Sequence, residues 1–305
     1  MLKPPAFYNI KNSFIVETGE SPYEICNRLQ EEGLIRSALA AKIYLRVSKL
    51  GSKIQAGEFS FSDPLSIEDI FAKLQHGRDE KTITIPEGFR LEQVAARFCQ
   101  ANIACQEGYV RVLAVLRREL GEGYFFPDTY AVDNSTSLES LIETVKQNFS
   151  VKIKNVFDLP SPPLSEEKIM VLASLVEREA ISDQERPVIA GILFNRIQEE
   201  WPLQVDATVQ YLVGCQEIKK EECSAKDWWP ADLTESDLKL NSNFNTYKQS
   251  GLPPQPICNP GLKSIFAAAQ PQASDYYFYL HDKQGQVHYA KTLEEHNDNI
   301  AQFLR

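Results

Sequence analysis

A strongly apolar helical segment that ends in two carboxylates, Ala173-Ser-Leu-Val-Glu-Arg-Glu-Ala180, constrains the fold more than any other part of the sequence. Apolar residues recur there at steps of three and four, as a helix with one buried stripe requires. The residues of this stripe are Ile169, Leu172, Ala173, Val176 and Ala180. The pattern predicts a helix from Ser165 to Ala180 that packs one face against a core.

The two glutamates of this helix point in different directions, because successive helix residues are about 100° apart. Glu179 lies at the edge of the apolar stripe, whereas Glu177 lies nearer the polar side with Arg178. Apolar surroundings raise the pKa of a carboxyl group, which can then act as a general acid near neutral pH. In the alternative interpretation, both glutamates are solvated or paired with Arg178 and Arg186, as most surface glutamates are.

The composition fits a folded protein that is large enough for two domains, with 305 residues of which 43% are hydrophobic. The net charge of -10 and the lack of a basic stretch argue against nucleic-acid binding. The four histidines lack zinc-site spacing, so we expect no metal and no cofactor.

Six cysteines are too few for a disulfide scaffold. Cys99 with Cys105, and Cys215 with Cys223, could bridge in an oxidising compartment, but we favour separate buried thiols.

The first ten residues do not resemble a signal peptide, and no apolar run is long enough to cross a bilayer. Two explanations stay open. Either the protein is cytoplasmic, or an export or anchor segment is missing from the sequence.

The arrangement of expected helices and strands predicts an α+β protein. After a leader of residues 1–11, residues 12–80 should form a small α/β module in the order strand, helix, helix, strand, helix. Residues 81–305 should form a larger domain of mixed helices and strands, with a further boundary near 159–164 in a proline-rich stretch. Its expected elements are a strand at 81–85, helices at 91–100, 107–120, 138–151, 165–180, 184–199, 203–212, 262–269 and 293–304, and a hairpin at 276–290.

Several motifs in residues 81–305 resemble the endolytic murein transglycosylases, the MltG or YceG-like family, in their order and spacing. The motifs are Thr84-Ile-Pro-Glu-Gly88, Glu122-Gly-Tyr-Phe-Phe-Pro-Asp-Thr-Tyr130, Leu172-Ala-Ser-Leu-Val-Glu-Arg-Glu179, Phe194-Asn-Arg196, Leu203-Gln-Val-Asp-Ala-Thr-Val209, Asn245-Thr-Tyr-Lys-Gln-Ser-Gly-Leu-Pro-Pro254, Pro256-Ile-Cys-Asn-Pro-Gly261 and Glu295-His-Asn297. Residues 12–80 more loosely resemble the LysM-like module that precedes the catalytic part in this family.

The resemblance implies an enzyme that cleaves the MurNAc-GlcNAc bond within peptidoglycan strands and leaves a 1,6-anhydro-MurNAc end. It also implies a location at the extracytoplasmic face of the cytoplasmic membrane, with cell-wall synthases as potential partners. Glu179 aligns with the family's catalytic glutamate and Glu177 is the alternate. Ala180 departs from the hydroxyl residue that many members carry at the next position.

The same resemblance places a set of motif residues in the glycan cleft. They are Asn195, Gln204, Asp206, Thr208, Tyr211, Asn245, Tyr247, Leu252, Pro253 and Pro254. Each also has a structural interpretation: the polar ones as caps, the tyrosines as core, and the prolines as a rigid turn. Two other functions stay open. One is a hydrolase that uses Glu179 with Asp206, and the other is a non-catalytic glycan-binding scaffold.

Overall fold

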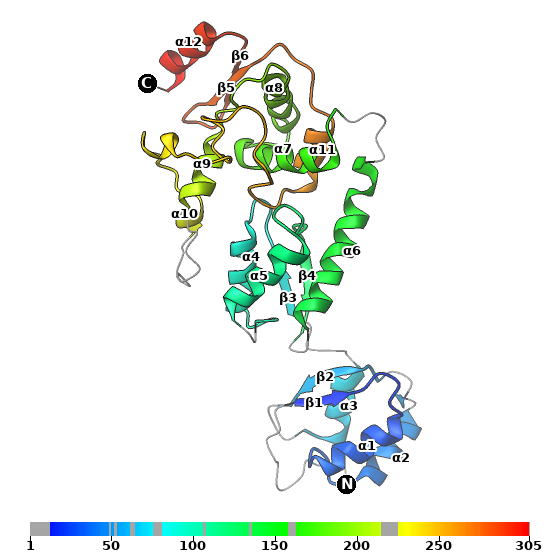
Figure 1. Ribbon diagram of the computed structural model, residues 1–305. Helices are drawn as coiled ribbons and strands as arrows, with labels where there is room; N and C mark the ends of the chain where they lie inside the picture. The colour runs from blue at the N-terminus through cyan, green and yellow to red at the C-terminus, as the bar shows by residue number, and fades with distance from the viewer. Residues whose placement is uncertain are drawn as a thin grey trace. The chain divides into compact units, whose positions relative to one another are not determined.

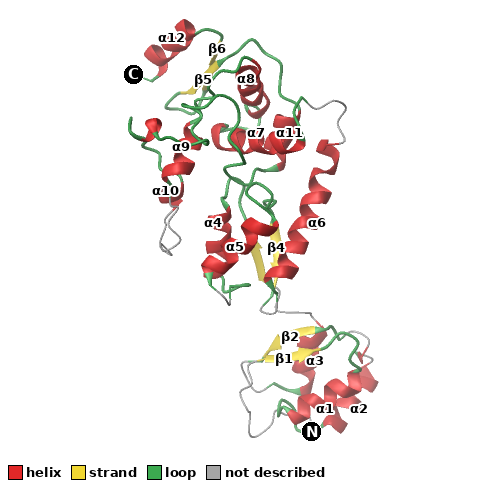
Figure 2. Ribbon diagram, viewed as in Figure 1, coloured by secondary structure: helices red, strands yellow, loops and turns green. Residues whose placement is uncertain are grey.

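The structure is a computed structural model that describes residues 13–48, 50–51, 54–61, 65–75, 81–105, 108–133, 136–157, 163–214 and 225–304 (Figure 1). The chain forms two compact units. One contains the residues up to 83 together with 131–137, and the other contains 84–130 and 138 onward. Helices alternate with small two-stranded sheets, as the α+β prediction requires (Figure 2). Most of the proline-rich stretch near 159–164 falls outside the described residues, so a boundary there stays a prediction.

The N-terminal unit has the element order that the sequence predicts. Its elements are β1 (Ser13–Val16), α1 (Pro22–Glu31), α2 (Ala38–Ser48), β2 (Gly57–Ser60) and α3 (Ile67–Gln75). Strands β1 and β2 pair antiparallel with Phe14 opposite Phe59, and both side chains are buried. Ser21 and Glu24 form a capping box at the start of α1. The unit therefore has a core of its own, while its likeness to a LysM module stays a prediction.

The next elements along the chain are β3 (Lys81–Thr84), α4 (Leu91–Gln100), α5 (Tyr109–Glu119), β4 (Thr129–Val132) and α6 (Leu138–Phe157), and the division between the two units falls within β3 and β4. Strand β4 was not predicted, because its residues follow the Gly- and aromatic-rich loop and only four of them are extended. It pairs with β3, and the amide of Ile85 donates to the carbonyl of Asp128 at 2.9 Å. Helix α6 extends beyond the predicted end at Val151.

The rest of the larger unit is built around helix α7 (Glu166–Glu179). Around it lie α8 (Arg186–Gln198), α9 (Asp206–Val213), α10 (Ala225–Trp228), the 3-10 turn η2 (Asp237–Lys239) and α11 (Leu262–Ala269). Helices α8, α9 and α11 pack against α7, and every residue from Ile169 to Val176 is buried. The prediction of a single buried stripe was therefore too narrow. Ser174 lies on the face expected to be polar, but it is buried and its hydroxyl accepts a hydrogen bond from the amide of Ile257 at 3.1 Å.

The chain ends in the predicted hairpin and helix. Strands β5 (Phe278–His281) and β6 (Val287–Ala290) pair antiparallel, with Leu280 opposite His288. Helix α12 (Leu293–Phe303) packs against both strands and begins at a capping box of Thr292 and Glu295. Among the described residues, no helix combines the length and the apolar character needed to span a bilayer.

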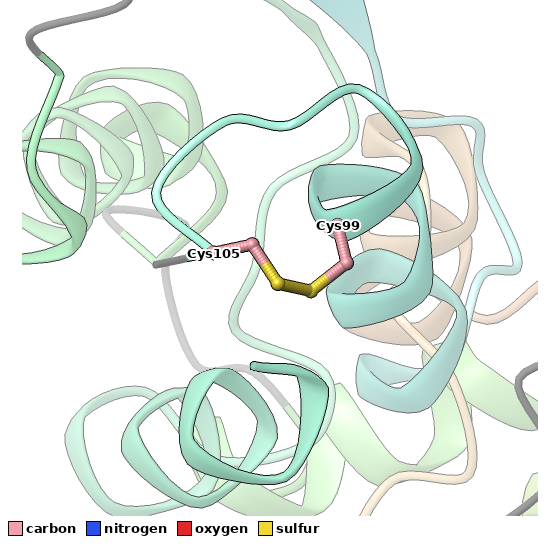
Figure 3. Close-up of a disulfide and its surroundings, with 2 residues drawn as sticks. All are labelled: Cys99 and Cys105. Carbon is pink, nitrogen blue, oxygen red and sulfur yellow. A yellow bond between two sulfur atoms is a disulfide. The ribbon is translucent and has the colours of Figure 1, made fainter. Parts of the chain in front are cut away.

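Cys99 and Cys105 form a disulfide at the end of α4 (Figure 3), so the favoured prediction of separate thiols was wrong for this pair. The chain turns back immediately after the helix, with Asn102 and Ala104 in the left-handed region, and this brings the two Cα atoms to 5.0 Å. Cys26 and Cys258 are free and buried, as expected. Cys215 and Cys223 lie outside the described residues.

Candidate active site

A cavity of about 520 Å³ lies in the larger unit where the end of α7 meets the start of α9, strand β5 and helix α12. The elements that line it are far apart in sequence, and the packing of α7 against α9 and of α12 against β5 brings them together. The lining residues are Glu179, Arg196, Leu203, Gln204, Asp206, Tyr247, Phe278, Tyr279, Leu280, His281, Leu293, His296, Ile300 and Leu304. Acidic, aromatic and aliphatic side chains thus share one cavity, which suits a ligand with polar groups and apolar faces.

Glu179 is the last residue of α7, and its half-buried carboxyl group faces this cavity. The hydroxyl of Tyr279 donates a hydrogen bond to its Oε2 at 2.8 Å. Burial raises the pKa of Glu179, and the negative charge of Asp206 raises it further. The Tyr279 hydroxyl, the charge of His281 and the backbone amide of Ala207 act in the opposite direction. The side chain is therefore suited to both protonation states, since burial favours the acid and nearby donors stabilise the carboxylate.

Glu177 faces a different part of the unit and does not line the cavity. Its Oε2 accepts hydrogen bonds from the amide of Gly261 at 3.0 Å and from the hydroxyl of Ser264 at 2.7 Å. Its Oε1 lies 3.5 Å from a guanidinium nitrogen of Arg186. Since Gly261 is the N-cap of α11, Glu177 places a negative charge at the positive end of that helix. These contacts give Glu177 a structural role in joining α7, α8 and α11.

Asp206 and Gln204 line the cavity on the segment that leads into α9. The hydroxyl of Tyr247 donates to Oδ1 of Asp206 at 2.5 Å. Gln204 has a φ of +54°, a left-handed conformation that costs a non-glycine residue on the order of 1 kcal/mol. Its amide donates to the carbonyl of Thr246 at 3.0 Å, which helps to hold this conformation. The segment is thus held in a fixed shape beside Glu179.

The other predicted cleft residues make internal contacts instead of lining the cavity. The amide group of Asn195 donates to the carbonyls of Ser274 at 2.8 Å and Tyr276 at 3.0 Å, and so anchors the chain before β5. Thr208 is fully buried, and its hydroxyl lies 3.0 Å from that of Thr246. The amide nitrogen of Asn195 and the hydroxyl of Thr208 thus have partners within the protein, and substrate binding by these two residues stays a prediction.

Asn245 and Tyr211 are likewise part of the interior. The buried side chain of Asn245 donates to the carbonyl of Leu240 at 2.8 Å. The ring of Tyr211 is buried, with its centroid 5.2 Å from that of Phe244 and 4.1 Å from the guanidinium carbon of Arg90. Tyr211 is therefore a core aromatic, the structural alternative that its sequence position left open.

The segment Leu252–Pro254 also lies outside the cavity lining. Leu252 packs against the main core, Pro253 is buried and Pro254 is exposed. Of the predicted substrate-binding residues, the structure brings Gln204, Asp206 and Tyr247 together with Glu179.

Comparison with known proteins assigns the chain to a family. The model of the YceG-like family matches residues 14–302, which is nearly the whole sequence. The chain belongs to the YceG-like family.

Relatives of this YceG-like protein include the endolytic murein transglycosylase of Bacillus subtilis (strain 168), which is 30% identical over 95% of this chain and 84% of the relative. The endolytic murein transglycosylase of Streptococcus pneumoniae (serotype 2, strain D39) is 27% identical, and the match covers 95% of this chain but 58% of that protein. A crystal structure of a yceG-like protein from Listeria monocytogenes matches with a TM-score of 0.60 and 28% identity, over 94% of this chain and 98% of the other.

Several residues of the cavity of this YceG-like protein were not predicted from its sequence. Tyr279 and His281 alternate along β5, so they share one face of the strand, and this spacing is the signal that could have found them. The imidazole of His281 lies 3.0 Å from the carboxylate of Glu185. Arg196 was recognised only as part of a motif. Its guanidinium donates to the carbonyls of Tyr277 and Leu203, each at 2.7 Å, and so joins β5 to the segment before α9.

Proposed function

We propose that this protein is a peptidoglycan lytic transglycosylase that cleaves the MurNAc-GlcNAc bond inside glycan strands and leaves 1,6-anhydro-MurNAc ends. The activity named for its relatives supports the reaction class. The position of Glu179 carries the proposal from the structural side. Glu179 is half-buried and has a raised pKa, its carboxyl group accepts a hydrogen bond from the Tyr279 hydroxyl, and it lines the cavity.

In the first step, protonated Glu179 donates its proton to the oxygen of the scissile glycosidic bond. The C1–O bond breaks, the GlcNAc unit leaves as an alcohol, and positive charge develops at C1 of MurNAc. Negative charge develops on Glu179 at the same time. The Tyr279 hydroxyl and the backbone amide of Ala207 already point to this carboxyl, so they stabilise that charge without reorganising.

In the second step, the Glu179 carboxylate takes the proton from the 6-hydroxyl of the same MurNAc unit. The freed O6 attacks C1 and closes the 1,6-anhydro ring, which restores protonated Glu179 for the next cycle. Attack from within the substrate carries the entropic advantage of an intramolecular reaction. One carboxyl group is sufficient for both steps, whereas common glycosidases use two.

The competing reaction is hydrolysis, because Asp206 supplies a second carboxylate to the same cavity. Digestion of purified glycan strands in heavy-oxygen water distinguishes the two reactions. The proposal predicts anhydro ends that carry no heavy oxygen, as seen by mass spectrometry. Reducing MurNAc ends that carry one heavy oxygen would instead show hydrolysis, for which Asp206 is the candidate second carboxylate.

The substrate also sets where the enzyme works. Peptidoglycan lies outside the cytoplasmic membrane, so the proposed activity places the protein at the extracytoplasmic face of that membrane. There cell-wall synthases are its proposed partners. The N-terminal unit is proposed as a LysM-like module that contributes to glycan binding.

A further inference from the structure

An exposed tryptophan adjoins the cavity of Glu179 and has no part in the chemistry described above. Trp201 is 43% exposed. Its ring centroid lies 5.1 Å from that of Tyr277 and 6.4 Å from that of Phe278. Phe278 lines the cavity and is stacked in turn on His296, another lining residue, at 5.1 Å. A row of rings thus continues from the cavity to Trp201.

The backbone holds Trp201 in a fixed position. Helix α8 ends in a Schellman motif, in which the amide of Trp201 donates to the carbonyl of Arg196 at 2.8 Å and the amide of Glu200 donates to that of Ile197 at 3.2 Å. Glu200 takes the left-handed conformation of this motif, with a φ of +56°. A hydrophobic residue commonly follows such a cap, but it is usually covered, whereas much of this indole faces solvent.

The same segment leads directly into the cavity. Pro202 forms an isolated bridge with Ser250, and the next residues, Leu203 and Gln204, line the cavity wall. The guanidinium of Arg196 packs 5.1 Å from the ring of Phe278, so the helix cap and the ring row are also joined through side chains. Trp201 therefore lies at the edge of the cavity on a rigid support.

We propose that Trp201 forms an outer saccharide subsite, where its indole stacks on a sugar of the glycan strand beyond the units held beside Glu179. Sugar rings present C–H faces that match the flat apolar face of an indole, and aromatic residues combine a large contact area with a polar group. This inference rests on the proposed function, since an enzyme that cuts inside a strand must hold sugars beyond the bond that it cleaves. Its occupant is a sugar ring of the strand, held through the C–H face of the ring and not through charge.

The test measures binding to glycan strands freed of their stem peptides, in proteins that carry Glu179→Gln so that no cleavage occurs. Loss of a stacked aromatic contact is worth about 0.5–1.5 kcal/mol, so Trp201→Ala should raise the dissociation constant about 2- to 12-fold. Trp201→Phe keeps an aromatic face and should restore part of the affinity. Phe266→Ala removes an exposed aromatic residue on α11 that does not line the cavity, and it should leave the affinity unchanged.

Kinetics in proteins that retain Glu179 give an independent readout. Trp201→Ala should raise KM for long strands while kcat stays the same, as expected when uniform binding is lost. Equal affinities of the Trp201→Ala and parent proteins would overturn the proposal. If Trp201→Phe loses as much affinity as Trp201→Ala, and its thermal midpoint is also lower, the role of Trp201 is purely structural. That result would overturn the proposal as well. If the unsubstituted enzyme releases no anhydro ends and no variant binds glycan, the proposed function itself fails.

Discussion

Replacing Tyr279 by phenylalanine removes one hydroxyl group, which donates a 2.8 Å hydrogen bond to Oε2 of Glu179. The ring is kept, so the packing around β5 should not change. A hydrogen bond to a charged group is worth about 1.5–3 kcal/mol, and the carboxylate charge is only partly developed in the transition state. Losing about half of that energy should raise the barrier by about 0.75–1.5 kcal/mol, which lowers kcat about 4- to 12-fold.

The pH dependence of Tyr279→Phe has a defined sign. The Tyr279 hydrogen bond lowers the pKa of Glu179, so its removal raises that pKa. Glu179 must be protonated to begin the reaction, and a higher pKa keeps it protonated to higher pH. The high-pH limb of the kcat profile should therefore move upward in pH.

The assay counts anhydro ends released from purified glycan strands across a pH series, with thermal unfolding as a check that the variant is folded. An unchanged kcat would refute the role of Tyr279 in stabilising the developing carboxylate. A high-pH limb that moves to lower pH would refute the assignment of Glu179 as the titrating acid.

Three further predictions concern neighbouring parts of the unit. Asp206→Asn removes a negative charge that raises the pKa of Glu179. The high-pH limb of the kcat profile should therefore move to lower pH, opposite to the effect of Tyr279→Phe, and a move to higher pH would contradict this. Glu177→Ala removes the carboxylate that accepts hydrogen bonds from α8 and from the start of α11. The free energy of unfolding, measured in urea, should fall by about 3 kcal/mol, and a fall of less than about 1 kcal/mol would contradict the structural role. Replacing Cys99 and Cys105 together by serine removes a disulfide with a sequence separation of 6. The free energy of unfolding, measured in urea under oxidising conditions, should fall by roughly 2 kcal/mol, and equal stability would mean that the bond does not form in solution.

The sequence predicted the order of elements well, because helices such as α7 and strands such as β5 carry strong local patterns. Local pattern could not reveal that residues 169–176 of α7 are buried on all sides, since this depends on α11, which lies far along the chain. The same limit explains strand β4, where four residues gain their extended form by pairing with β3.

The candidate site was predicted in part for a similar reason. The helical angle between Glu177 and Glu179 was enough to direct the two side chains differently, and the structure gives them different partners. Motif membership did not separate residues that line the cavity, such as Gln204, from residues that hold its walls, such as Asn195. Tyr279 was missed because the alternation along β5 shows only which residues share a face of the strand. It does not show that this face meets Glu179, which lies 100 positions earlier.

The most direct test of Glu179 as the single acid and base compares the end groups made by the unsubstituted enzyme, Glu179→Gln and Glu177→Gln. Glutamine keeps the shape of glutamate and can still accept the Tyr279 hydrogen bond, but it cannot transfer a proton. Mass spectrometry of digested glycan strands should find anhydro-MurNAc ends with the unsubstituted enzyme and with Glu177→Gln, and almost none with Glu179→Gln. Anhydro ends that persist in Glu179→Gln and vanish in Glu177→Gln would contradict the assignment.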